Sequence, residues 1–228
     1  MPRSSRSPTC DNYFGKVFAH LGGALALAAV SAETLTLEEQ LEKAVGSKLI
    51  TILLSIAIAI VLIIGIFKTS PGSPQKYVFF VAFALWIGQT LKPLVDKLQA
   101  RATLGRILAL TTGVFLGMMA IGFYDRQNIL GFGPYLFAGL AGLILVQLLI
   151  YAFASPAEKK TALNWLRLFG VALFAAYTAY DVQLVKAGAA GCRAARAAGR
   201  APDYPVESLG LFLDFVNLFA KIGGGNSE

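Results

Sequence analysis

Apolar residues gather into seven segments along this chain, and short polar stretches separate them. The segments are residues 17–32, 49–67, 77–91, 107–124, 132–154, 162–185 and 205–222. The second (LITILLSIAIAIVLIIGIF) and the fifth (FGPYLFAGLAGLILVQLLIYAFA) are long enough to cross the hydrocarbon core of a bilayer, which is about 30 Å thick. The pattern predicts an all-α, polytopic membrane protein with seven helices. Because the first and last segments are shorter and more polar, six full spans and one partial span are the alternative.

The polar stretches between the segments are too short to hold a second domain. SPGSPQK (70–76), DRQN (125–128) and SPAEKK (155–160) are predicted to be turns. The acidic linker TLTLEEQLEK (34–43) is helix-prone and is expected at the membrane interface. The sequence therefore predicts one transmembrane domain over residues 1–228, with a short basic tail at residues 1–16.

The first segment has alternatives to retention as a membrane span. A basic start, an apolar stretch and Val30-Ser31-Ala32 together are similar to a secretory signal with its cleavage site. The beginning MPRSSRSP is also compatible with an organellar transit peptide. Retention as a true first span is the prediction.

Composition supports the membrane assignment. Hydrophobic residues make up 56% of the chain and charged residues 14%, whereas about a quarter of a soluble protein is charged. The net charge of +7 is explained by basic loops that meet anionic headgroups, so no nucleic acid is predicted as a partner. Lys and Arg lie on both sides of the alternating segments and favour a cytosolic N-terminus by a narrow margin. No P-loop, nucleophile elbow, zinc motif or dinucleotide fingerprint occurs, so the sequence predicts neither an enzyme nor a cofactor.

Two aspartates lie within apolar segments. Asp181 is near the end of LFGVALFAAYTAYDVQLV, and Asp214 is in the middle of SLGLFLDFVNLFAKI. An ionised carboxylate at bilayer depth costs about 2.5–3.5 kcal/mol on insertion scales, so such a group usually faces the protein interior and binds a proton, an ion or a partner. Two in consecutive segments predict one shared site. The alternative is that each aspartate only caps or pins a helix through hydrogen bonds.

Further polar residues are spaced to face the same site. At 3.6 residues per turn, four positions fall on one stripe with Asp214, namely Glu207, Gly210, Asn217 and Lys221. Tyr177 and Thr178 precede Asp181 by four and three residues and offer hydroxyl groups. Two carboxylates in contact cannot both ionise cheaply, so the pair is expected to share a proton and to titrate as a unit. A doubly ionised pair repels, which can move a helix or attract a divalent cation.

The run AAYTAYDVQLV, followed by DYPVESLGLFLDFVNLFAKI, is similar to the closing signature of the Bax-inhibitor family (transmembrane Bax inhibitor motif proteins). The matching residues are Asp181 and Gln183 in the first motif, and Asp203, Tyr204, Leu211, Leu213, Asp214, Asn217 and Phe219 in the second. The third segment, FALWIGQTLKPLVD, resembles another family pattern through Gly88, Leu91 and Pro93.

This resemblance implies a seven-helix bundle whose last helix is surrounded by the other six. It also implies that Asp181 and Asp214 form the pH-sensitive gate of a calcium leak pathway, where calcium binds transiently. The implied role is in calcium homeostasis and cell-death control in an endomembrane (endoplasmic reticulum or Golgi), with the mitochondrial inner membrane as the alternative. The expected partners are membrane lipids, calcium ions, protons and other membrane proteins.

The chain departs from the family pattern in three places, which bear on gating and not on the fold. Val182 replaces the usual Thr, AGAAGCRAARAAGRAP is inserted before the last segment, and the second segment lacks the Arg that some bacterial members place there. Two other functions stay open. One is a structural membrane subunit that keeps the fold without transport, and the other is a proton-coupled transporter of small solutes.

Other residues have narrower expectations. Arg193, Arg196 and Arg200 are predicted to share one face of a short Ala-rich helix and to contact anionic lipid or an acidic partner, the alternative being a solvated basic loop. His20 is expected to be a packing residue. Cys10 and Cys192 are too far apart in sequence to predict a disulfide. The Gly113-x-x-x-Gly117 motif predicts close packing within the bundle.

Overall fold

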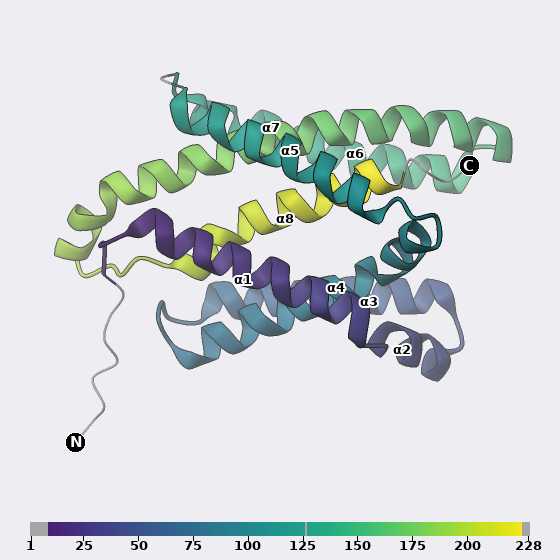
Figure 1. Cartoon of the computed structure of the whole chain (residues 1–228), viewed down its shortest axis with the longest axis horizontal. Coiled ribbons are helices and arrows are strands. Elements are labelled where there is room, and N and C mark those ends of the chain that lie inside the picture. Colours follow the sequence, from purple (N-terminus) through teal and green to yellow (C-terminus); the bar gives the residue numbers. More distant parts are fainter. Residues whose placement is uncertain (1–8, 126, 225–228) are drawn as a thin grey trace. The chain divides into compact units, whose positions relative to one another are not determined.

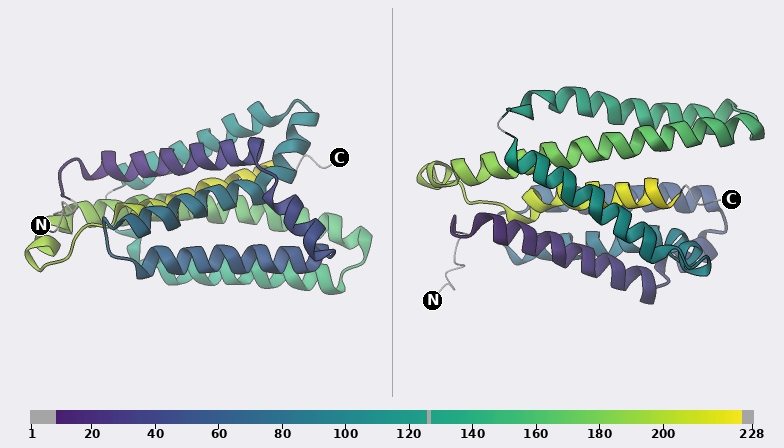
Figure 2. Two further views of the ribbon diagram at one scale, coloured as in Figure 1. Left: turned by 90° about the horizontal axis from the view of Figure 1, so that it is seen from below. Right: turned by 45° about the horizontal axis from the view of Figure 1, so that its top comes forward.

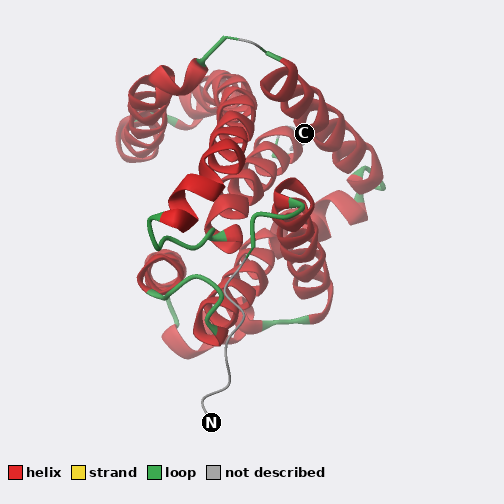
Figure 3. Ribbon diagram, turned by 90° about the vertical axis from the view of Figure 1, so that its left-hand side faces the viewer, coloured by secondary structure: helices red, strands yellow, loops and turns green. Residues whose placement is uncertain are grey.

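The structure, a computed structural model, describes residues 9–125 and 127–224, and its regular elements there are all helical (Figure 3). In chain order they are α1 (Tyr13–Thr34), α2 (Leu37–Val45), α3 (Lys48–Lys68), α4 (Pro74–Ala100), α5 (Leu104–Tyr124), the 3-10 helix η1 (Ile129–Phe132), α6 (Gly133–Phe153), α7 (Pro156–Ala197) and α8 (Tyr204–Gly223) (Figure 1). The predicted all-α class is confirmed. The helix-prone linker forms α2, whereas Arg3 and Arg6 of the basic tail lie outside the described residues.

Six helices in the described part are long and apolar enough to cross a membrane. They are α1, Ile50–Lys68 of α3, α4, α5, Ile129–Phe153 including α6, and Glu158–Ala197 of α7. Large apolar side chains on α3, α5 and α6 are exposed, as expected for helices that face hydrocarbon. The chain is therefore a multi-pass membrane protein. The short α2 and the more polar α8 are not among the six.

The chain divides into two compact units, each assembled from segments that are distant in sequence. Unit 1 contains Met1–Asp96 and Ala187–Phe212, and unit 2 contains Lys97–Lys186 and Leu213–Glu228. Helix α8 contributes to both. It supplies the fully buried Phe212 to unit 1 and the fully buried Leu218 to unit 2, consistent with a last helix that is enclosed by protein. The single domain over 1–228 stays a prediction.

Close contact between α1 and α4 organises unit 1. A Cβ atom added at Gly88 would lie 2.2 Å from the carbonyl oxygen of Ala28, so only glycine allows the two backbones to approach this closely. Beside it, Gln89 Nε2 donates to the carbonyl of Ser31 at 2.5 Å, and its Oε1 accepts from the amide of Leu37 at 2.8 Å. Helix α1 is thus packed into unit 1, and retention of this segment as the first span stays a prediction.

Unit 2 is built around α7. A Cβ atom added at Gly122 on α5 would lie 2.3 Å from the carbonyl oxygen of Ala179 on α7. Helices α6 and α7 lie side by side as a hairpin (Figure 2). The prediction that Gly113 and Gly117 mediate close packing is wrong, because an added Cβ atom at either would meet no atom within 4 Å. The contact falls instead at Gly122, where α5 approaches α7.

Helix α7 is longer than the sequence predicted. It runs for 42 residues to Ala197, whereas the apolar segment ends at 185. The Ala-rich insert continues the helix because alanine has the highest helix propensity. Gly199, with φ +75°, lies just beyond the end of α7, where a left-handed residue is usual. Arg193 and Arg196 are exposed on α7, but Arg200 follows Gly199, so the prediction that all three arginines share one helical face is wrong.

A disulfide joins Cys10 to Cys192, across a sequence separation of 182 residues. The expectation of no disulfide is wrong. This expectation failed because the sequence pattern predicted too early an end for the helix. The extension of α7 carries Cys192 to the start of α1 in unit 1. The Tyr204 hydroxyl also donates to the Thr9 carbonyl in this region.

Candidate functional site

The two predicted aspartates meet inside unit 2. Asp181 on α7 and Asp214 on α8 are joined by a side-chain hydrogen bond and interact electrostatically. Asp214 is only 4% exposed, and its Oδ2 has no hydrogen-bond partner among the described residues. An ionised carboxylate can only accept hydrogen bonds, so a direct bond between two carboxyl groups requires a proton on one of them. The predicted contact between the two aspartate side chains is confirmed.

The part of α7 that carries Asp181 is anchored by contacts on both sides of it. Before Asp181, the Ala179 backbone packs against Gly122. After it, Gln183 Nε2 donates to the Gln127 carbonyl at 2.8 Å, and its Oε1 accepts from the Ile129 amide at 3.0 Å. These bonds tie α7 to the connection between α5 and α6. These contacts therefore hold the α7 backbone in place on both sides of Asp181.

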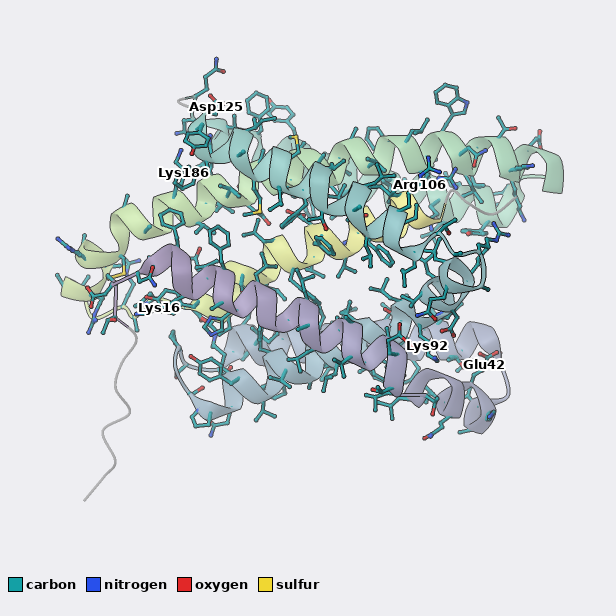
Figure 4. All side chains as sticks on the ribbon, viewed as in Figure 1. Lys16, Glu42, Lys92, Arg106, Asp125 and Lys186 are labelled. Carbon is teal, nitrogen blue, oxygen red and sulfur yellow. A yellow bond between two sulfur atoms is a disulfide. The ribbon has the colours of Figure 1, made fainter. Side chains whose placement is uncertain are left out.

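Lys186 adds a further anchor, one turn of α7 after Asp181. Its Nζ donates to the carbonyl of Phe123 at 2.6 Å and to that of Asp125 at 3.4 Å (Figure 4). The cation also lies 5.6 Å from the centre of the Phe123 ring. Lys186 thus neutralises the carbonyl end of α5, where a cation complements the helix dipole.

Aromatic packing positions Asp214. The next residue, Phe215, meets Phe115 of α5 edge to face, with ring centroids 5.3 Å apart. Leu218 and Phe219 on the following turn are buried. Helix α5 therefore packs against both helices that carry an aspartate.

The supporting residues predicted around the pair have different surroundings. Tyr177 interacts electrostatically with both Asp181 and Asp214, so its hydroxyl lies near the pair. The Thr178 hydroxyl donates to the carbonyl of Phe174 at 2.9 Å, which leaves it within its own helix. Similarly, Asn217 Nδ2 donates to the Leu213 carbonyl at 2.8 Å.

Glu207, the first residue of the predicted stripe, belongs to unit 1. Its carboxyl group hydrogen-bonds with the hydroxyl of Tyr13 on α1. Its described contacts are therefore with the start of α1, where Gly188 on α7 also approaches Tyr13. The structure gives Glu207 a local structural partner.

The pair supplies few ligands for a resident metal ion. Among the described residues, no group of three or more His, Cys, Asp or Glu side chains is placed to hold one. Calcium takes six to eight oxygen ligands.

Unit 1 contains a buried ion pair that the sequence did not predict. Lys76 Nζ lies 2.5 Å from Asp203 Oδ2 and donates to the Ile66 carbonyl at 2.6 Å. The lysine side chain is 1% exposed, although the sequence placed it in a polar turn. The signal that could have found the pair was the position of Asp203 in the second family motif, immediately before a buried helix.

Aromatic side chains surround this end of unit 1. The His20 ring is stacked on Tyr77 and Tyr204, with centroids 5.8 and 6.2 Å apart. His20 Nδ1 hydrogen-bonds with the carbonyl of Lys16 at 2.6 Å. The predicted packing role of His20 is confirmed.

Fold and site together define a class: a helical, multi-pass membrane protein in which the last two helices carry two carboxyl groups in contact, one of them buried. Residues 10–223 match the family model described as "Inhibitor of apoptosis-promoting Bax1", so the chain belongs to the Bax-inhibitor family.

Three relatives illustrate the range of the similarity. An uncharacterised protein of Deinococcus radiodurans is 26% identical over 221 residues, which cover 95% of this chain and 90% of that protein. The inner membrane protein YbhL of Escherichia coli is 30% identical over 172 residues, 75% of this chain and 70% of YbhL. Bax inhibitor 1 of Schizosaccharomyces pombe is 26% identical over 171 residues, 75% of this chain and 59% of that relative.

Proposed function

We propose that this chain forms a proton-controlled leak pathway for calcium and other cations, gated by Asp181 and Asp214. The observation that carries the proposal is the direct contact between two carboxyl groups, one of them almost completely buried, in a multi-pass membrane protein. Such an arrangement is costly unless it is used, and binding of protons or cations is the use for which carboxyl groups are suited.

The gate works through the number of protons on the pair. With one shared proton, the two carboxyl groups attract each other and hold α7 and the second half of α8 together. Loss of that proton leaves two negative charges in contact, which repel each other and also attract a divalent cation. Movement of either helix then opens a path lined by carboxylate oxygens.

The wider role is proposed from the family. A relative bears the name Bax inhibitor 1, which supports a part in the control of cell death through calcium homeostasis. We propose an endomembrane, either endoplasmic reticulum or Golgi, as the location, with the mitochondrial inner membrane as the alternative. The relative described as an inner membrane protein supports a membrane location and does not choose between these compartments.

Calcium flux through the purified chain in liposomes tests the proposal. The wild type should show a flux that rises as pH is raised through the titration of the pair. Asp181→Asn and Asp214→Asn should each abolish this pH response, because an amide cannot ionise. The matched control is Asp96→Asn, which removes an exposed carboxylate that pairs with Lys92 at 3.4 Å.

Three other outcomes have definite meanings. An unchanged pH profile in both aspartate variants, with normal folding, would reject gating by this pair. No flux of any ion at any pH would favour a structural subunit of a larger complex. Solute uptake that depends on a proton gradient, without calcium flux, would favour a transporter.

A further inference from the structure

Unit 2 contains a polar cavity with a volume of about 330 Å³, and neither aspartate of the pair lines it. Its polar lining comes from the end of α6, the start of α7 and the end of α8, and consists of Gln147, Tyr151, Lys160, Asn164, Arg167 and Lys221. Three of these side chains are cationic. Among the described residues that line the cavity, none is an aspartate or a glutamate.

Arg167 is held in a fixed orientation at this cavity. Its Nη1 donates to the carbonyl of Gly224 at 2.8 Å, and its Nη2 donates to Asn164 Oδ1 at 2.8 Å. A guanidinium group carries five N–H donors. These two bonds fix the orientation of the guanidinium plane and leave its other N–H donors for a ligand. Arg167 forms no ion pair with any described residue.

Lys221 is brought to the same place by packing. Its aliphatic stem lies against Gly170, where an added Cβ atom would come within 3.0 Å of the lysine Cδ. Its Nζ donates to Gln147 Oε1 at 3.3 Å, and it forms no ion pair within the described part of the chain. Arg167 and Lys221 are close enough to interact electrostatically, and like charges repel. An anion in the cavity would relieve that repulsion.

The remaining polar groups favour the same kind of ligand. Asn164 and Gln147 each use the amide oxygen as an acceptor, for Arg167 and Lys221 respectively. Their NH2 groups are therefore left as donors. A cavity with cations and amide donors matches a ligand with several negatively charged oxygens, and arginine is well suited to bind phosphate through two parallel hydrogen bonds.

The cavity lies near the ends of three helices, and the end of a membrane helix is the level at which it meets the headgroups. Helix α6 ends at Phe153, α7 begins at Pro156, and α8 ends at Gly223. Tyr151 and Trp165 flank this level and are 57% and 71% exposed. Exposed Tyr and Trp are typical of the interfacial zone, and basic pockets between membrane helices can bind phosphate headgroups.

We propose that this cavity is a binding site for a phosphate group, supplied either by the headgroup of an anionic phospholipid or by free phosphate. Both sources present the same oxygens to Arg167 and Lys221, and Lys160 adds positive charge at the entrance. The proposal is independent of proton gating by the aspartate pair.

Tryptophan fluorescence provides the first arm of the test. The chain has two tryptophans, so Trp86→Phe leaves Trp165 as the reporter beside the cavity. In nanodiscs, brominated phosphatidylglycerol should quench Trp165 at about a tenfold lower mole fraction than brominated phosphatidylcholine, a preference that corresponds to one charge-assisted contact. Lys160→Gln, Arg167→Gln and Lys221→Gln together should abolish the preference. The matched control, Lys97→Gln with Arg101→Gln and Arg106→Gln, removes the same charge from exposed positions of unit 2 and should preserve it.

Calorimetry on the wild type in an uncharged detergent provides the second arm. Saturable binding of inorganic phosphate, compared with chloride at equal ionic strength, together with equal quenching by the two lipids, would assign the site to free phosphate. Arg167→Lys keeps the charge but loses the paired donors, so it should weaken binding about tenfold even if the triple variant does not fold. Wild-type protein that neither binds phosphate nor distinguishes the lipids would overturn the proposal, as would wild-type affinity in Arg167→Lys.

Discussion

Two acidic residues of the α8 region have opposite partners. Asp203, immediately before α8 in unit 1, faces the ammonium group of Lys76. Asp214, within α8 in unit 2, faces the carboxyl group of Asp181. The Asp203 side chain is 23% exposed, whereas residue Asp214 is 4% exposed. The less accessible carboxyl group is therefore the one without a neighbouring cation.

This difference separates a fixed contact from one that can change. Lys76 gives Asp203 a counterion, and this ion pair holds the start of α4 against the start of α8. In the proposed mechanism, the contact of Asp214 with a second carboxyl group depends on a shared proton and can be made and broken by protons. The first arrangement stabilises unit 1, and the second is the proposed means by which unit 2 responds.

The largest expected effect is on the ion pair. Lys76→Met removes the cation and leaves Asp203 partly buried without a counterion, which should lower the free energy of unfolding by about 3–5 kcal/mol. Thermal or denaturant unfolding of the purified chain in detergent measures the loss. Lys68→Met, which alters an exposed lysine near the same turn, is the control. If Lys76→Met unfolds like the wild type, the pair does not hold unit 1 together.

The disulfide should have the next largest effect. Cys10→Ser releases residues 9–12 from α7, and loss of a disulfide typically costs about 2–4 kcal/mol. The double variant Cys10→Ser with Cys192→Ser should unfold like the single variant, because either change breaks the same bond. A double variant much less stable than the single one would show that Cys192 matters for reasons besides the bond.

The same bond provides a test of membrane sidedness. Disulfides persist in oxidising compartments, whereas the distribution of Lys and Arg favours a cytosolic N-terminus. Thiol labelling with an impermeant reagent and an impermeant reductant, in cells permeabilised only at the plasma membrane, decides between them because the reagents then reach only the cytosolic face of endomembranes. If Cys10 and Cys192 are labelled only after detergent also opens the endomembranes, they lie on the lumenal side and the predicted orientation is overturned.

Local patterns in the sequence were sufficient to predict the helices and the contact between the two aspartates. Segment length and hydropathy located the membrane helices, and the cost of two carboxylates in apolar segments pointed to a shared site at Asp181 and Asp214. These inferences need no knowledge of distant contacts. The family signature added the position of Asp203 but not its partner.

The remaining features depend on residues that meet only after folding. Lys76 looks like a turn residue until the helix containing it is packed against Asp203. The pairing of Cys10 with Cys192 depends on where α7 ends, and the Ala-rich insert has no apolar pattern to mark that end. The cations of the phosphate cavity come from α7 and α8 and are individually unremarkable.

Asp214→Asn should have a smaller effect on stability than Lys76→Met. Asparagine keeps the volume of the side chain and can donate a hydrogen bond to Asp181, so the free energy of unfolding should change by about 1 kcal/mol or less. Asp203→Asn, the same chemical change, should cost more because it leaves Lys76 as a buried cation without a counterion. Equal losses in the free energy of unfolding for the two variants would mean that the carboxyl groups of Asp214 and Asp203 are held in the same way.

The smallest effect is expected at the exposed arginines. We propose that Arg193, Arg196 and Arg200 contact anionic headgroups, each contributing up to about 1 kcal/mol that salt would screen. The wild type should be more stable in bilayers of phosphatidylglycerol than in phosphatidylcholine, and replacing all three arginines with Gln should reduce that difference at low salt. High salt should remove the arginine contribution but preserve more of the contribution from the enclosed Arg167 and Lys221. A preference for phosphatidylglycerol that the triple Gln variant retains in full at low salt would show that these arginines are only solvated.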